Sequence, residues 1–265
     1  MPDPEVVKRE LKYHEKLYSG FAQRHFARPA VRLLRCHMVA RILHLTGVGK
    51  ESRVLSLGCG IGDTELLLAP YVAEVVGVDL SPAAIRQARA DAERLGIGNA
   101  RFEEGSDAEG RFDLAMGIFF LHHLPDDDLA ELPRQVRRHL APGGMFYSLD
   151  PSRRRLSGAL GRLLVPWMMK RYRTPDEREL EPEATCRLFG AAGFDARVEM
   201  YDFGSSPLAG LFPGWGWGYG LAREFDDWLL GFDWFRKRGS NFEIVGRTPT
   251  SAAGPLVGPF AVPHA

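Results

Sequence analysis

The sequence has few of the features that mark secreted, zinc-binding or membrane-spanning chains. Its 265 residues include three cysteines, Cys36, Cys59 and Cys186, which lie far apart and form no C-x-x-C pair. A disulfide framework and a zinc site are therefore unsupported, and a reducing, cytoplasmic setting is the default expectation. No run of about 18 apolar residues predicts a membrane-spanning helix. The charged N-terminal stretch also lacks the apolar segment of a signal peptide.

Neither sign of charge is in excess, since Lys and Arg total 34 and Asp and Glu total 34. A net charge of zero gives no global field that would attract nucleic acid. Hydrophobic residues make up 45% of the chain, which is enough to bury a core and excludes a wholly disordered chain. The length suits one large α/β domain of roughly 200–250 residues or two smaller domains.

Hydrophobic periodicity predicts helices that alternate with short strands. An amphipathic helix is predicted over 30–45, after polar helices with scattered aromatic residues over 5–28. Ser81 and Pro82 indicate a helix N-terminus, and Gly96 indicates its end. Strands are predicted at 53–59, 74–80, 99–104, 112–120, 143–151, 194–203 and 241–247, with helices at 126–140 and 183–193 and a turn at 141–144. This alternation indicates βαβ units and a parallel sheet.

A glycine-rich loop is the first candidate site. Gly58, Gly60 and Gly62 follow the first predicted strand and precede a predicted helix. Glycine tolerates positive φ and allows the backbone to approach a ligand closely. Asp79 ends the second strand about twenty residues later, which in a parallel sheet places its carboxylate beside the loop, where it can accept both ribose hydroxyls of an adenosine. The pattern therefore predicts adenosine binding, and a turn that serves only strand–helix packing is the alternative.

Asp63 distinguishes two cofactors that can use such a loop. The NAD fingerprint G-x-G-x-x-G has its third glycine where this chain has Asp63. A carboxylate at a helix start repels a pyrophosphate, but it does not repel the zwitterionic methionine end of S-adenosylmethionine. A nicotinamide-dependent dehydrogenase is therefore the weaker hypothesis.

Four segments resemble, in order and spacing, the motifs of the class I S-adenosylmethionine-dependent methyltransferases of small-molecule type. They are "VLSLGCGIG", "VVGVDLSPAAIRQARADAERLG", "FDLAMGIFFLHHL" and "RRHLAPGGMFYSLDP", within about residues 50–151. The resemblance implies an α/β fold with a seven-stranded, mostly parallel sheet, helices on both faces and the last strand inserted antiparallel. We expect an N-terminal helical cap at 1–48, a cofactor-binding core at 49–151, and substrate-side helices and last strands of the same domain at 152–248. The tail at 249–265 is proline-rich without periodicity and is expected to be disordered or loosely packed.

The resemblance implies which residues hold S-adenosylmethionine. Asp79 falls on the residue that binds the ribose, Leu80 lies beside the adenine, and Ser106 or Asp107 contacts the adenine amino group. The loop that wraps the cofactor comprises Gly58, Cys59, Gly60 and Gly62, and the strand end that faces its methionine part comprises Gly117 and Ile118. Members of the superfamily usually have Asp or Glu at the position of Ser56, and the loss of that carboxylate weakens a contact to the cofactor's amino group by about 1 kcal/mol.

Two histidines beyond the fourth strand are candidates for proton transfer. Methyl transfer is an in-line displacement on a sulfonium carbon, so the protein supplies positioning, desolvation and, for some acceptors, a base. His122 or His123 can deprotonate a hydroxyl or an amine, because a neutral imidazole suits that role. Alternatively, one histidine caps the loop and the other packs beneath it. No "NPPY"-like sequence follows this strand, which disfavours methylation of nucleic-acid bases and translation factors.

The flanking segments are expected to choose the substrate. Tyr13 and Tyr18 either line the pocket as part of a lid or pack as a cap. Trp215 and Trp217, in a glycine-spaced aromatic loop, can close over an apolar or planar ligand or form a dimer surface. The basic segment 151–175 carries an apolar stripe and can lie on an anionic membrane, although a substrate lid with a solvated basic face is the favoured interpretation.

These patterns together predict a methyltransferase that uses S-adenosyl-L-methionine to methylate a small, largely apolar metabolite, with the acceptor atom and the oligomeric state left open. The expected partner is a small-molecule substrate and not nucleic acid. The alternative hypothesis is a non-catalytic methyltransferase-like subunit that serves as a binding or scaffold protein, suggested by Ser56 and by the displaced acid at Ser106 and Asp107.

Overall fold

The computed structural model describes residues 27–106, 108–157 and 178–250. Seven strands form one sheet in the order β3-β2-β1-β4-β5-β7-β6. The strands are β1 (Arg53–Leu57), β2 (Glu74–Asp79), β3 (Ala100–Glu104), β4 (Phe112–Ile118), β5 (Leu140–Pro151), β6 (Asp195–Asp202) and β7 (Asn241–Arg247). Neighbours among β1 to β5 are parallel, whereas β7 runs antiparallel to both β5 and β6. The predicted seven-stranded sheet with an antiparallel last strand is confirmed.

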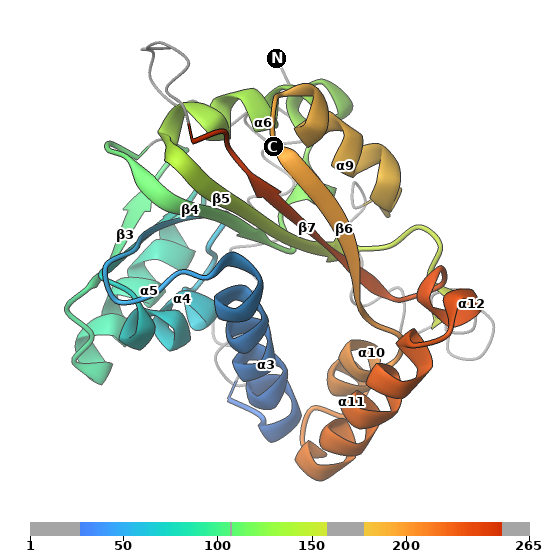
Figure 1. The fold of residues 1–265 in the computed structure, drawn as a ribbon. Helices are drawn as coiled ribbons and strands as arrows, with labels where there is room; N and C mark the ends of the chain where they lie inside the picture. Colours follow the sequence, from blue (N-terminus) through green and yellow to red (C-terminus); the bar gives the residue numbers. More distant parts are fainter. Residues whose placement is uncertain (1–26, 107, 158–177, 251–265) are drawn as a thin grey trace.

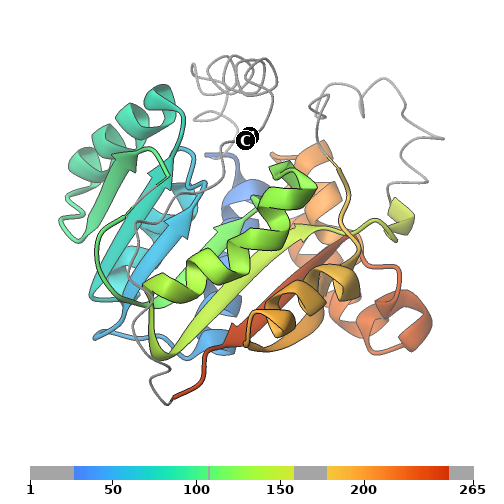
Figure 2. The same ribbon diagram turned by 90° about the horizontal axis from the view of Figure 1, so that it is seen from above.

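Helices cover both faces of this sheet (Figure 1). They are α3 (Pro29–Thr46), α4 (Asp63–Leu68), α5 (Pro82–Leu95), α6 (Asp126–His139), α9 (Pro182–Ala191), α10 (Ser205–Leu211), α11 (Gly216–Leu230) and α12 (Asp233–Arg236), with short 3-10 turns η1 (Ala69–Tyr71) and η2 (Leu121–His123). Helices α6 and α9 lie side by side on one face, as the view from above shows (Figure 2). On the opposite face α3 packs against α10 and α11.

The ends of α5 follow from local sequence. The Ser81 hydroxyl accepts a hydrogen bond from the Ala84 N–H at 3.3 Å, and Pro82 begins the helix. Gly96 ends it in the left-handed conformation, with a φ of 66°. Both predicted boundaries are therefore confirmed, and they hold the loop before α5 at the end of β2.

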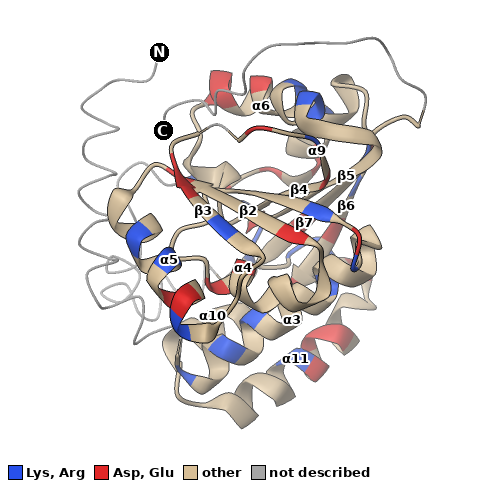
Figure 3. Cartoon of the chain, turned by 90° about the vertical axis from the view of Figure 1, so that its left-hand side faces the viewer, with Lys and Arg blue, Asp and Glu red and all other residues tan. Residues whose placement is uncertain are grey.

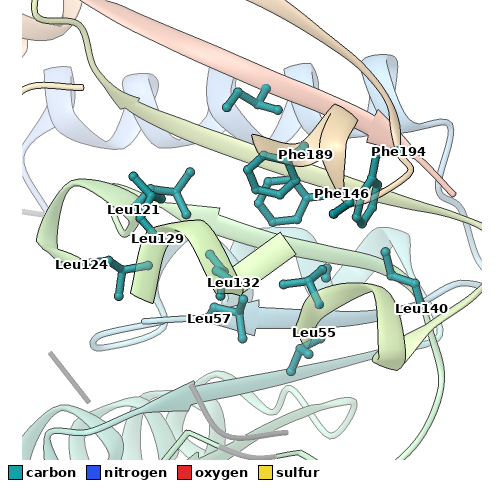
Figure 4. Packing of buried hydrophobic residues seen from close by; sticks show 14 of the residues in the cluster. Leu55, Leu57, Leu121, Leu124, Leu129, Leu132, Leu140, Phe146, Phe189 and Phe194 are labelled. Atoms are coloured by element: carbon teal, nitrogen blue, oxygen red, sulfur yellow. The ribbon is translucent and has the colours of Figure 1, made fainter. Parts of the chain in front are cut away.

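Alternation along the strands divides the core between the two faces. Leu55 and Leu57 pack with residues of α6, and Val54 packs with residues of α3 on the other side. Ser56 shares the face of Val54. On the α6 face, Phe146 stacks on Phe189 with ring centroids 4.2 Å apart (Figure 4).

The turn predicted at 141–144 is instead part of β5. The pairing of β4 with β5 passes from Phe112–Leu140 to Leu114–Met145, so β5 accommodates extra residues as a bulge. Gly143 adopts a φ of 77° within this bulge. The glycines therefore serve an irregular strand rather than a separate turn.

The aromatic loop predicted around Trp215 and Trp217 is wrong as a local structure, because α11 begins at Gly216. A Cβ at Gly218 would lie 2.3 Å from the Trp215 indole, so this glycine allows the helix to pack closely against that ring. The glycines here permit close approach instead of flexibility.

Several predictions lie outside the described residues. They are the helices over 5–28 with Tyr13 and Tyr18, the adenine contact Asp107, most of the segment 151–175 and most of the tail. Among residues 27–106, 108–157 and 178–250, no helix combines the length and apolar character that crossing a bilayer requires.

The close packing of β2 leads to a stability prediction. A Cβ at Gly77 would lie 2.8 Å from both the Cys59 sulfur and the Phe102 ring. We expect Gly77→Ala to lower the free energy of unfolding by about 1–3 kcal/mol through overpacking, measured by urea denaturation. The control is Gly98→Ala, whose Cβ would meet no atom within 4 Å. Equal stability of the two variants would contradict this packing argument.

Candidate functional site

The candidate site lies where the carboxyl ends of β1, β2 and β4 meet. Strand β1 stands between β2 and β4, so the chain leaves β1 toward one edge of the sheet and leaves β4 toward the other. Such a switch point opens a crevice at the carboxyl ends of the strands. The three loop glycines that follow β1 all have positive φ: Gly58 (63°), Gly60 (55°) and Gly62 (74°).

Asp79 organises the backbone around this loop. One carboxylate oxygen accepts the Gly60 N–H at 2.8 Å, and the other accepts the Ser81 N–H at 2.8 Å. The Gly105 N–H donates to the Asp79 carbonyl at 3.0 Å, which brings the loop containing Ser106 alongside. The structure therefore brings together the predicted ribose acid, the glycine loop and one of the two predicted adenine contacts, with half-buried Leu80 next to Asp79.

Cys59 is a packing residue within the loop. It is buried, and its sulfur faces the glycine at position 77 of β2. Burial, together with the nearby Asp79 carboxylate, raises the pKa of the Cys59 thiol well above its usual value. The side chain is therefore held as a neutral thiol and is unsuited to nucleophilic chemistry.

Phe119 and Phe120 follow β4, and Phe120 packs against the glycine loop. A Cβ at Gly58 would lie 2.4 Å from the Phe120 ring, and a Cβ at Gly117 would lie 3.1 Å from the same ring. Phe119 is the non-glycine residue with positive φ, 53°, in the described part of the chain. Because such a conformation is strained for a bulky residue, it is typical of functional sites. The predicted residues Gly117 and Ile118 thus lie beside an apolar, partly exposed surface.

A buried carboxylate on α4 was missed by the sequence reasoning. Glu65 is buried, and its Oε1 accepts a hydrogen bond from the Ser56 hydroxyl at 2.6 Å. Burial raises the pKa of Glu65 to about 7, although the Ser56 hydrogen bond opposes that shift. Ser56 stands where the superfamily usually carries an acid, so Glu65 places a carboxylate beside that position from the neighbouring helix. The available signal was an acid within the apolar run "TELLL".

Arg35 of α3 reaches the start of α4. Its guanidinium pairs with Asp63 at 2.7 Å, donates to the Thr64 hydroxyl at 3.2 Å and lies 5.8 Å from the centroid of the Phe119 ring. The charge of Asp63 is therefore offset, and the electrostatic argument against a pyrophosphate at this position loses most of its force. Arg35 ties α3 to the edge of the candidate site.

The two histidines lie on η2, directly after β4. The Nδ1 of His122 lies 3.0 Å from Oδ1 of Asp150 on β5, and the His122 backbone N–H donates to the same oxygen at 3.2 Å. Burial raises the pKa of Asp150 to about 7, against the stabilising effect of backbone N–H groups of η2. His122 is buried, whereas the half-buried His123 ring lies with its centroid 4.0 Å from that of His122. Whether either ring acts on a substrate stays a prediction.

The two predicted pocket tryptophans are not brought to this site. Trp215, directly before α11, and Trp217, on α11, are both exposed, with their ring centroids 4.7 Å apart. A separate cleft of about 760 Å³ lies along β6 and contains none of the predicted site residues. Its arginines are largely paired, because Arg41 contacts Glu199 at 3.1 Å and Arg154 contacts Glu183 at 2.9 Å.

The described start of the basic segment is tied to carboxylates. Arg154 pairs with Glu181 and Glu183, and Arg155 pairs with Glu179 at 2.7 Å. These two arginines are therefore partly neutralised within the protein, which weakens the membrane hypothesis for this segment.

Comparisons with known proteins agree with this geometry. Residues 54–144 match a family model described as a methyltransferase domain. The chain is 33% identical over 105 residues to the uncharacterized methyltransferase YcgJ of Bacillus subtilis, covering 38% of this chain and 41% of that protein. It is 29% identical over 168 residues to the probable methyltransferase ltbC of Aspergillus luteorubrus, covering 56% of this chain and 59% of that protein. The chain thus matches about half the length of these curated relatives.

The fold also resembles that of solved methyltransferases. The magnesium protoporphyrin IX methyltransferase ChlM from Synechocystis PCC 6803, solved with bound SAH, aligns with a TM-score of 0.60 at 15% identity, over 92% of this chain and 99% of that chain. The chain therefore has the fold of the class I S-adenosylmethionine-dependent methyltransferases. Within it, residues 54–144 are the part that matches the methyltransferase-domain model.

The raised pKa of Glu65 gives a pH-dependent stability prediction. A folded-state pKa of about 7, against the usual 4.5, means that the folded protein holds this proton more tightly than the unfolded chain. The contribution of Glu65 to the free energy of unfolding is fully present below about pH 4.5 and is lost as the pH rises through about 7. Glu65→Gln keeps the oxygen that accepts from Ser56 and removes the titration. We expect it to stabilise the protein at about pH 8, by up to about 3 kcal/mol, and to have little effect near pH 4.5.

Urea unfolding of both proteins at about pH 5 and about pH 8 checks this expectation. Asp150 also has a raised pKa, but it is present in both proteins. Its effect on the free energy of unfolding therefore cancels when the variant is compared with wild type. Glu93→Gln, on the exposed side of α5, serves as the control and should show no pH-dependent difference. If the free energies of unfolding of Glu65→Gln and wild type differ by the same amount at both pH values, the raised pKa of Glu65 is contradicted.

Proposed function

We propose that the protein is an S-adenosylmethionine-dependent methyltransferase acting on a small, largely apolar acceptor. The observation that carries the proposal is the junction of the Gly58–Gly62 loop with Asp79 at the switch point, with Glu65 beside Ser56. The match of residues 54–144 to a methyltransferase domain and the fold shared with an SAH-bound enzyme support it.

The residues present fit this cofactor. Asp79 offers a carboxylate for the ribose hydroxyls, Leu80 an apolar side chain for the adenine, and Ser106 a hydroxyl for the adenine amino group. Glu65 offers a buried carboxyl that titrates near neutral pH, and a bound ammonium group would hold it in the ionised form. The backbone of Gly117 and Ile118 borders the same place from β4. S-adenosylmethionine would supply an electrophilic methyl group there.

The chain's own contribution is positioning and exclusion of water. Phe119, Phe120 and Ile118 present partly exposed apolar surface next to the glycine loop, which favours an apolar acceptor over a strongly charged one. The ChlM enzyme, which shares this fold, is named for a porphyrin substrate, and this name supports an apolar acceptor here.

His122 is the proposed proton acceptor, with Asp150 as its positioning residue. When Asp150 is ionised, its oxygen 3.0 Å from Nδ1 favours the tautomer of His122 that carries its proton on Nδ1, which leaves Nε2 able to accept one. The half-buried His123, stacked on His122, is the other candidate and is the more accessible of the two. A methyl acceptor that is already deprotonated would need neither histidine as a base.

The non-catalytic alternative loses part of its motivation. It was suggested by the absence of an acid at Ser56, and Glu65 places a carboxylate 2.6 Å from that hydroxyl. An intact loop and an ordered Asp79 also favour cofactor binding over a scaffold role.

Cofactor binding is the direct test. Isothermal titration with S-adenosylmethionine should show saturable binding to the wild-type protein, and Asp79→Asn should weaken it by at least about tenfold, because the variant loses a charged hydrogen-bond acceptor for the ribose. Glu93→Gln is the control and should bind as wild type does. No detectable heat with wild-type protein at millimolar cofactor would overturn the proposal, and thermal unfolding of Asp79→Asn separates loss of a contact from loss of the loop.

Methyl transfer tests the proposed chemistry. With cofactor labelled in its methyl group, we expect label to enter the apolar fraction of a cell extract. His122→Ala should slow this transfer by about a hundredfold without changing cofactor affinity, because general-base catalysis contributes at least that much. A rate unchanged in both His122→Ala and His123→Ala would assign the two rings a structural role. Label confined to the aqueous fraction would contradict an apolar acceptor.

A further inference from the structure

The exposed apolar side chains of the protein gather on one surface. Nine of the twelve large hydrophobic residues that are exposed in the described part of the chain lie between positions 211 and 234. They are Leu211, Phe212, Trp215, Trp217, Leu221, Phe225, Trp228, Phe232 and Trp234. Scattered single apolar residues need no explanation on a soluble protein, but a contiguous group of this size marks an interaction surface.

The centre of this surface is a group that we call the aromatic stripe: Trp217, Leu221, Phe225 and Trp228 on α11, and Phe232 just after it. The four residues on α11 are separated by four, four and three positions, so they share one face of the helix. Trp217, Leu221, Phe225 and Trp228 are between 56% and 69% exposed. The rings also touch in sequence, since Phe225 stacks on Trp228 at 5.5 Å and Trp228 meets Phe232 edge-on at 5.1 Å.

The orientation of α11 is set by polar contacts on its inner side. Asp226 is buried, and its carboxylate accepts hydrogen bonds from the Gly204 N–H at 2.9 Å and the Ser205 N–H at 2.7 Å, at the start of α10. Arg223 donates to the Tyr201 carbonyl at 2.7 Å. Rotating the helix to bury the aromatic stripe would break these contacts and leave a buried carboxylate without partners, which is costly. The outward aromatic stripe is therefore a specified feature of the fold.

Charge at one end of the surface indicates its partner. The basic run begins with Arg236, the last residue of α12, and continues with Lys237 and Arg238, close in sequence to Trp234. Arg236 pairs with Asp233, whereas Lys237 and Arg238 make no ion pair within the described residues, and the Arg238 guanidinium lies 4.2 Å from the centroid of the Trp234 ring. Three exposed acids lie beside the aromatic stripe, Glu224, Asp227 and Asp233, and α11 carries charges of both signs (Figure 3). Asp227 pairs with Arg223 and Asp233 pairs with Arg236, so the charges of these two acids are offset within the protein. Tryptophans next to basic side chains are typical of surfaces that rest at the headgroup level of a bilayer.

We propose that the aromatic stripe and the basic end of α12 dock on the surface of an anionic lipid bilayer. The indole and phenyl rings enter the boundary between headgroups and acyl chains, and Lys237 and Arg238 contact anionic headgroups. This surface is distinct from the basic segment 151–175. It adjoins the candidate site through α3, because the Ala30 N–H donates to the Pro213 carbonyl at 2.9 Å and Arg35 on the same helix pairs with Asp63. An apolar acceptor dissolved in the bilayer would thus lie near the crevice, and this last step alone rests on the proposed function.

Vesicle flotation of the full-length protein tests the docking. We expect wild-type protein to float with vesicles of equimolar phosphatidylcholine and phosphatidylglycerol, with less binding to phosphatidylcholine alone and at high salt. The double variant Leu221→Glu, Trp228→Glu should reduce flotation by at least about tenfold, because it places charges in the aromatic stripe. Tyr71→Glu, Leu95→Glu is the matched control, since these side chains are 50% and 53% exposed elsewhere on the molecule. A blue shift of tryptophan fluorescence with vesicles should accompany wild-type binding.

Three outcomes would overturn the proposal. In the first, wild-type protein does not float with anionic vesicles at low salt. In the second, the aromatic-stripe variant floats as well as the control. In the third, light scattering would show a wild-type dimer that the aromatic-stripe variant converts to a monomer, without flotation, which would make this face a contact between copies of the chain. Thermal unfolding shows that the variants fold, and calorimetric titration with S-adenosylmethionine is measured separately. A failure of cofactor binding and a failure of docking are therefore distinguishable.

Discussion

The position of β1 between β2 and β4 is the constraint on which the rest of the molecule depends. All three strands run parallel, so their carboxyl ends meet at one edge, and the chain departs from β1 and β4 in opposite directions. The glycine loop, Asp79 and Phe120 are brought together for this reason, because each follows a different one of these strands. The η2 histidines come directly after Phe120 at the end of β4. A chain with the same residues in another strand order would separate them.

Helix α3 holds this arrangement from one side of the sheet. Arg35 pairs with Asp63 near the glycine loop, and Arg41 contacts the buried Glu243 of β7, which also accepts the Tyr147 hydroxyl at 2.6 Å. One helix thus links the first half of the sheet to its antiparallel end. Because removal of one member of a buried ion pair leaves an uncompensated charge, these contacts constrain how α3 lies more than they add to stability.

Local patterns in the sequence were sufficient for the sheet and for much of the site. Ser81 and Gly96 bound α5 as predicted, and Asp79 lies against the glycine loop as expected from a parallel sheet. Glu65 could not be found in this way, because its partner Ser56 lies on a strand and the contact depends on how α4 packs. Within "TELLL", an acid is normally assigned to the solvent face. The contact between His122 and Asp150 likewise depends on the pairing of β4 with β5.

The same limit explains why the segment before β7 was mistaken for a flexible loop. Hydrophobic patterning assumes that aromatic residues face inward and charges outward, and α11 does the reverse at Asp226 and Trp228. Sequence alone does not show that the Gly204 and Ser205 N–H groups donate hydrogen bonds to the Asp226 carboxylate.

The carboxylate of Asp226 has one more consequence. Because its hydrogen bonds fix the rotation of α11, the aromatic surface faces outward in the folded chain without any rotation of the helix. Association through that surface therefore requires no prior rotation of α11. The extent of association follows mass action, so the concentration of the binding partner determines what fraction of the protein is bound.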